Sequence, residues 1–188
     1  ESLAEAVLTF CLAGAVRAER GLEGQSHTML VHVSQLTGDQ ERVADALSEQ
    51  ISLWCAAKRQ GQDLESQVFA RVWDEMKGGM KSHQNDERVL KEAVRVLHSL
   101  VVVRLNSYAG EDLEYDTQPG RHLIAVGGNR LSRGLTLEGL TVSYFLRTAN
   151  MCDTLLQMAR WFWKLRPELV HCASPKGVLY GGLASRIV

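Results

Sequence analysis

Residues 127–139 read GGNRLSRGLTLEG and lie between two short apolar runs, LIAV at 123–126 and LTVSYFL at 140–146. Short apolar runs bounded by glycine are typical of buried strands. The sequence therefore predicts a glycine-rich, arginine-bearing loop between two strands of one sheet. Glycines alone indicate only a structural loop that needs positive backbone φ. The asparagine, the serine and the two arginines among them favour a functional loop, which α/β proteins commonly carry on a rigid sheet.

The rest of the chain alternates between strand and helix patterns. Apolar runs predict strands at 27–34 and 100–106. Amphipathic spacing predicts helices at 2–20, 37–58, 64–76 and 86–98, and one more that starts at Asp153. Strands interleaved with helices predict an α/β fold with a mostly parallel sheet flanked by helices. Such sheets bind ligands at the carboxyl ends of their strands, where we expect the glycine-rich loop and the helix with Gln157 and Arg160.

Length and composition fit one ordinary domain, or one lobe of a larger protein. The chain has 188 residues, of which 45% are apolar and 23% charged, and its net charge is −1. That balance gives no global basic field for nucleic acid. Residues 121–166 nevertheless contain only two acids against seven basic residues: Arg121, Arg130, Arg133, Arg147, Arg160, Lys164 and Arg166. This local excess suits a phosphate-bearing partner, or else a surface face balanced by acids elsewhere.

The cellular setting follows from cysteines and apolar runs. Cys11, Cys55, Cys152 and Cys172 form no C-x-x-C pair, so buried thiols in a reducing cytoplasm are expected. No apolar run is long enough to span a membrane, and no signal peptide is present. We therefore expect a cytoplasmic protein without membrane contact. The chain starts at Glu1 inside a helical pattern, which indicates a fragment of a longer protein.

Two other groups of residues could carry chemistry. His27 and His32 are not at metal-ligand spacing with a nearby carboxylate or thiol, so we interpret them as ordinary sheet or loop histidines. Four carboxylates between 111 and 116 could bind a divalent metal in a nuclease. The lysine that usually follows such acids is missing, since Asp116 is followed by Thr117 and Gln118. A solvated acidic loop is the favoured interpretation.

The glycine motif, SYFLR at 143–147 and DTLLQMARWF at 153–162 together resemble the Z-one domain. That family comprises large prokaryotic proteins described as endonucleases and often linked to restriction or phage defence. The resemblance covers roughly residues 2–162, and the long glycine motif is highly specific. It implies a Z-one domain at 1–166 and a weakly patterned tail at 167–188. This sequence departs from the family at Ala159, where the family has glycine, and after Phe162.

The Z-one domain is in turn similar to the second RecA-like lobe of superfamily-two helicases. In that comparison the segment around Arg133 and Gly134 occupies the fifth helicase motif, which couples nucleotide state to nucleic acid. Gln157 and Arg160 occupy the sixth, and the resemblance implies a catalytic pair in which Arg160 reaches ATP phosphates and Gln157 positions it. A guanidinium stabilises charge on a transferring phosphoryl group. The residues expected to contact nucleotide and DNA backbone are Gly127, Gly128, Asn129, Ser132, Arg133 and Gly134.

Nothing in the chain reads G-x-x-x-x-G-K-[ST]. The resemblance therefore implies that ATP with Mg²⁺ is shared with an N-terminal ATPase lobe elsewhere in the protein. It also implies DNA as a partner, and possible restriction or defence subunits. This chain alone is not expected to hydrolyse ATP. Two other functions stay open, namely a metal-dependent nuclease domain and a non-catalytic interaction module on a RecA-like scaffold.

Overall fold

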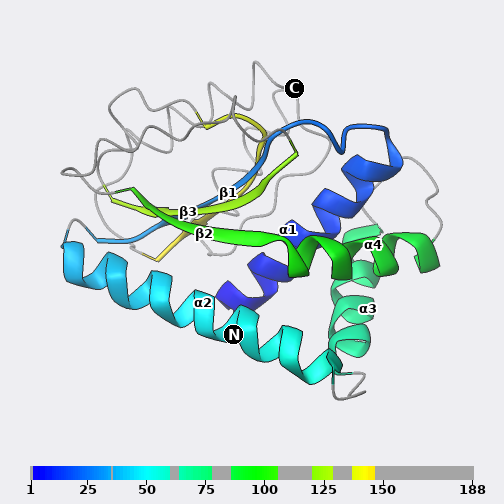
Figure 1. Cartoon of the computed structure of the whole chain (residues 1–188), viewed down its shortest axis with the longest axis horizontal. Coiled ribbons are helices and arrows are strands. Elements are labelled where there is room, and N and C mark those ends of the chain that lie inside the picture. Colours follow the sequence, from blue (N-terminus) through cyan, green and yellow to red (C-terminus); the bar gives the residue numbers. More distant parts are fainter. Residues whose placement is uncertain are drawn as a thin grey trace.

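The computed structural model describes residues 2–34, 36–59, 64–77, 86–105, 120–128 and 137–146 (Figure 1). The elements follow the predicted order, with ends that differ from the predicted ones by at most two residues. They are α1 (Ser2–Glu19), β1 (His27–His32), α2 (Thr37–Arg59), α3 (Leu64–Lys77), α4 (Asp86–His98), β2 (Leu100–Leu105), β3 (His122–Gly127) and β4 (Leu140–Phe145). The helix predicted from Asp153 onward lies outside the described residues.

The described strands form one parallel sheet in the order β2-β3-β1-β4. This confirms the predicted α/β class, and the sheet is wholly parallel in this part of the chain. β1 pairs with β3 in continuous register from His27 opposite His122 to His32 opposite Gly127. Its pairing with β4 is interrupted once, between Thr28 and Met29. The glycine motif connects β3 to β4, which are not neighbours because β1 lies between them.

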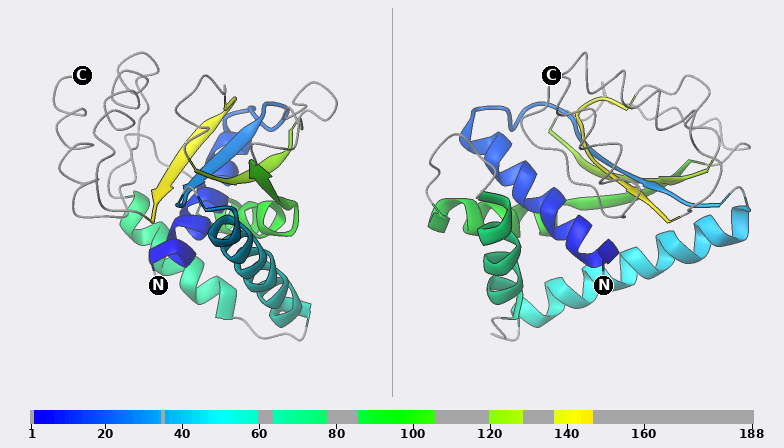
Figure 2. Two further views of the ribbon diagram at one scale, coloured as in Figure 1. Left: turned by 90° about the vertical axis from the view of Figure 1, so that its left-hand side faces the viewer. Right: turned by 180° about the vertical axis from the view of Figure 1, so that it is seen from behind.

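The four helices of the described residues lie on one face of the sheet, where α1 and α2 contact the strands and α3 and α4 pack on α1 (Figures 1 and 2). Alternate strand residues such as Met29, Val31 and Ile124 join the core that these helices form. Side chains of the opposite face, including Leu30 and Ala125, are also buried. Burial on both faces explains why the strands read as almost continuous apolar runs instead of alternating patterns.

The helices bury an aromatic and aliphatic core against this face. Phe10 of α1, and Phe69 and Trp73 of α3, are almost fully buried, so these rings are core residues. Trp73 Nε1 donates a hydrogen bond to the Asp86 carboxylate over 2.9 Å, which ties α3 to the first turn of α4. Cys11 and Cys55 are buried thiols, as predicted. The other two cysteines lie outside the described residues.

Candidate functional site at the carboxyl edge

The strand order places a topological switch point at the carboxyl ends of β1 and β3. These two strands are neighbours. From β1 the chain continues to β2, which lies beyond β3, whereas from β3 it continues to β4, which lies beyond β1. Where neighbouring parallel strands continue in opposite directions, a crevice opens outside their carboxyl ends, and this is the usual ligand site of open α/β sheets. Gly127 is the last residue of β3, so the glycine motif begins at this point.

Backbone hydrogen bonds hold β3, β1 and β4 together up to this edge. The N–H of Val33 donates to the carbonyl of Gly127 over 2.8 Å, and the N–H of Leu146 donates to the carbonyl of His32 over 3.0 Å. Gly127 and Gly128 are both buried. The first two residues of the predicted nucleotide site therefore lie on a fixed platform beside the end of β1.

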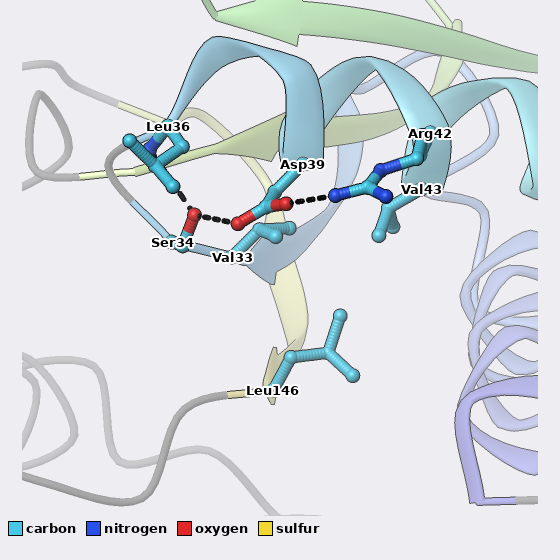
Figure 3. A pocket seen from close by; sticks show the side chains of 7 residues that line it. All are labelled: Val33, Ser34, Leu36, Asp39, Arg42, Val43 and Leu146. Carbon is cyan, nitrogen blue, oxygen red and sulfur yellow. Dashed lines mark hydrogen bonds and ion pairs between the residues drawn. The ribbon is translucent and has the colours of Figure 1, made fainter.

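An open hollow of about 780 Å³ lies at the same edge, between the ends of β1 and β4 and the start of α2 (Figure 3). Its volume is within the range of small-molecule sites. Four of its side chains are aliphatic and three are polar. The lining residues are Val33, Ser34, Leu36, Asp39, Arg42, Val43 and Leu146.

The polar side of the hollow is formed by the turn after β1 and the start of α2, which are joined by hydrogen bonds. The Ser34 hydroxyl accepts a hydrogen bond from the N–H of Leu36 over 3.1 Å and donates one to the Asp39 carboxylate. Arg42 pairs with the same carboxylate over 2.5 Å, and the buried Gln40 amide donates to the Ser34 carbonyl over 2.9 Å. These bonds order the turn that leads from β1 into α2.

The two charged groups of the hollow differ in exposure. The Arg42 side chain is 81% exposed, whereas that of Asp39 is 29% exposed. The guanidinium therefore reaches the solvent side of the rim, and Val33, Val43 and Leu146 form apolar walls (Figure 3). The hollow therefore combines apolar walls with an ion pair of which the cation is the more exposed partner.

Sequence reasoning missed the hollow. Its polar residues are Ser34, in the turn after the first strand, and Asp39 and Arg42, in the first two turns of the helix that begins at Thr37. The available signal was that turn's position, because a strand-to-helix turn in a parallel sheet must lie at the carboxyl edge. The contribution of Leu146 could not be anticipated, since it depends on β4 pairing directly with β1.

The last residues of the glycine motif lie at the opposite, amino edge. Gly139 has φ +64°, and a Cβ added there would lie 1.7 Å from the Ser26 carbonyl oxygen. The carbonyls of Glu138 and Gly139 accept hydrogen bonds from Thr28, from its hydroxyl over 2.7 Å and its N–H over 2.9 Å. Gly139 is thus a glycine required by backbone conformation and close packing, which is the structural interpretation of the motif.

The remaining predicted site residues fall outside the described part of the chain. These are Asn129, Ser132, Arg133, Gly134, Gln157 and Arg160. The acidic cluster at 111–116 is also outside it, and so is most of the basic cluster, of which only Arg121 is described. The structure therefore places Gly127 and Gly128 at the end of β3, and the functional roles of all the predicted site residues stay predictions.

The predicted interpretation of His27 is confirmed, because it is a buried histidine of the sheet with hydrogen bonds to His122 and Thr141. His32 stacks on Phe145 of β4 with 5.5 Å between ring centroids. Among the described residues, no three His, Cys, Asp or Glu side chains lie close enough to hold a metal ion.

Within the described ranges, every helix is too short or too polar to cross a membrane.

Comparison with known proteins identifies the family but no individual relative. No curated protein and no solved structure matches the chain. The model of the Z1 (Z-one) domain matches residues 2–168, which include both the described sheet and the glycine motif. The chain therefore belongs to the Z1 domain family.

Proposed function

We propose that this chain is the second motor lobe of a DNA-dependent ATPase, in a protein with endonuclease, restriction or phage-defence function. The Z1 family assignment and the parallel α/β sheet support this proposal. The observation that carries it is the start of the glycine motif at a topological switch point, with Gly127 bonded beside the end of β1. A motor lobe needs a fixed edge from which a loop can contact nucleotide and DNA.

In this proposal the lobe is RecA-like and completes an ATP site held mainly by another lobe. Arg160 reaches the phosphates of ATP across the lobe interface, and Gln157 positions it. Mg²⁺ binds with ATP to the other lobe. The segment from Asn129 to Gly134 contacts the nucleotide and the DNA backbone, where glycine amides can approach phosphate closely. Any restriction or defence subunits are further partners.

The test is the DNA-stimulated ATPase rate of the full-length protein with Arg160→Ala. Loss of an arginine finger lowers such rates by roughly a thousandfold or more, so we expect a fall of at least about a hundredfold. Arg95→Ala is the matched control, because Arg95 is an exposed helical arginine whose Glu92 pair lies on α4. Equal rates in Arg160→Ala and Arg95→Ala would refute the assigned role.

The same preparation separates the two other functions. Cleavage of DNA by this chain alone with Mg²⁺ or Mn²⁺, lost on Asp116→Asn, would instead identify a metal-dependent nuclease domain. Absence of both ATPase activity and DNA binding in the full-length protein would leave a non-catalytic interaction module.

A further inference from the structure

Two histidines and a threonine join three strands at the amino edge of the sheet, at the opposite end from Gly127 and Gly128. His27 Nδ1 of β1 and His122 Nδ1 of β3 are 2.9 Å apart, and the Thr141 hydroxyl of β4 is 2.8 Å from His27 Nε2. His27 is 1% exposed, and its ring stacks on Phe10 of α1 with 4.0 Å between centroids. The three side chains, His27, His122 and Thr141, form one hydrogen-bonded chain across β3, β1 and β4.

This chain of bonds has room for only one proton between the two Nδ1 atoms. One ring must donate and the other must accept, because a hydrogen bond needs one of each. The Thr141 hydroxyl can adapt to either choice, since it can donate to or accept from His27 Nε2. A second proton would make both Nδ1 atoms donors and place two cations in contact, so the hydrogen bond between the strands would be lost.

The ring of His27 has little space in which to adjust. A Cβ added at Gly14 of α1 would lie 2.9 Å from His27 Cε1 and 3.0 Å from its Nδ1, so the helix backbone passes close against the ring. Phe10 covers a ring face. A single added proton keeps the bond, because a protonated His27 can donate from Nδ1 to a neutral His122 and from Nε2 to Thr141. When both rings are protonated, His27 cannot turn toward α1 to separate the two cations, and relief requires β1 and β3 to separate at their amino ends.

The charged groups around the pair also oppose its protonation. Arg17 of α1, which donates to the Ser26 carbonyl over 3.0 Å, faces both rings, and Glu92 of α4 faces His122. Burial, then His122 and then Arg17 hold the pKa of His27 well below its usual range. Burial and Arg17 also lower the pKa of His122, against the opposing influence of Glu92. The neutral pair is therefore the stable form near pH 7.

We propose that His27, His122 and Thr141 form a proton-sensitive latch that holds the amino ends of β1 and β3 together and opens on acidification. The same two strands carry the Val33–Gly127 hydrogen bond at their other ends, five register positions along. Opening the latch separates β1 and β3 at one end, and the other end of the same strand pair carries Gly127 and Gly128. The latch does not depend on the proposed motor function, because it rests on the sheet alone.

The lowered pKa of His27 determines how stability changes with pH. The pKa of His27 is lower in the folded than in the unfolded chain, where it is about 6.5, so the unfolded chain binds the proton first as pH falls. The stabilisation is thus complete above pH 6.5 and is lost as pH falls toward the folded pKa. For His27 alone, the unfolding constant rises about tenfold for each pH unit below 6.5.

The test combines histidine ¹⁵N NMR and amide hydrogen exchange on the chain between pH 7.5 and 5.5, with exchange corrected for its intrinsic pH dependence. We expect His27 to stay neutral near pH 6.5. We also expect the His27 amide, which donates to the Arg121 carbonyl, and the Leu123 amide to lose protection on acidification earlier than the Val33 amide. An ordinary histidine pKa near 6.5 for His27 in the folded wild-type chain would overturn the proposal.

His122→Asn supplies a second, independent readout. The asparagine amide can bond to His27 Nδ1 in either protonation state but does not itself take up a proton. The variant is expected to keep amino-edge protection at pH 5.5, whereas His98→Asn, which changes an exposed histidine at the end of α4, should open like wild type. Equal acid-induced opening in both variants would refute the latch, and a His122→Asn chain that does not fold leaves the wild-type titration as the decisive result.

Discussion

Replacing Gly139 by alanine should destabilise the chain by about 3–4 kcal/mol. The residue has φ +64°, and a non-glycine residue in this left-handed region costs about 1–2 kcal/mol. The new Cβ would also lie 1.7 Å from the Ser26 carbonyl oxygen, which no side-chain rotation can relieve. The turn must therefore move, and two hydrogen bonds with Thr28 are lost at about 1 kcal/mol each.

Gly21→Ala is the matched control for this prediction. Gly21 has φ +73° but nothing lies within 4 Å of an added Cβ, so only the conformational cost of about 1–2 kcal/mol applies. Urea unfolding followed by circular dichroism gives both free energies, provided that the m-values are equal. Costs that agree within about 0.5 kcal/mol would refute the argument, because they would show that the contact with Ser26 contributes nothing.

Two further predictions concern the carboxyl-edge hollow and the core. Arg42→Ala in the full-length protein should weaken DNA binding several-fold and reduce the slope of log affinity against log salt by about 1, since Arg42 is the exposed cation of the rim, whereas Arg95→Ala should change neither. An unchanged slope in Arg42→Ala would exclude a phosphate contact there. Trp73→Ala should cost about 3–5 kcal/mol in urea unfolding because Trp73 is 2% exposed, whereas the half-buried Trp54→Ala should cost clearly less. Similar costs for the two tryptophans would contradict the core assignment.

Local pattern determined most of the fold correctly. Apolar periods of helical length predicted α1 to α4, and short β-branched runs predicted β1 to β4. Both faces of the central strands are buried, α4 buries one side, and the middle of α1 is buried all round. The strand order could not be predicted, since a parallel sheet is joined by crossovers whose destinations are set by tertiary packing. Nothing local in residues 100–105 indicates that β2 pairs with β3 and not with β1.

The candidate site was less accessible to sequence reasoning for the same reason. Gly127 and Gly128 were predicted as site residues because the motif itself is conspicuous, and the structure places them at the carboxyl edge without testing their role. The hollow brings Ser34 close to Leu146. The latch joins His27 to His122, which are 95 positions apart in the sequence. Interactions between residues so far apart follow from register, and register was not available before the sheet was known.

The glycine motif serves two edges of the sheet, and its residues should not be treated as one site. It begins at the carboxyl edge, where Gly127 is bonded beside the end of β1, and it ends at the amino edge, where Gly139 packs against Ser26. Loss of activity after a Gly139 substitution would follow from an unfolded turn as readily as from a lost ligand contact. Substitutions at the carboxyl edge affect Gly127 and Gly128, which we propose as part of the nucleotide site. A mutational study of this motif therefore has to measure stability and ligand binding for each variant, since only a loss of binding at unchanged stability assigns a residue to the nucleotide or DNA site.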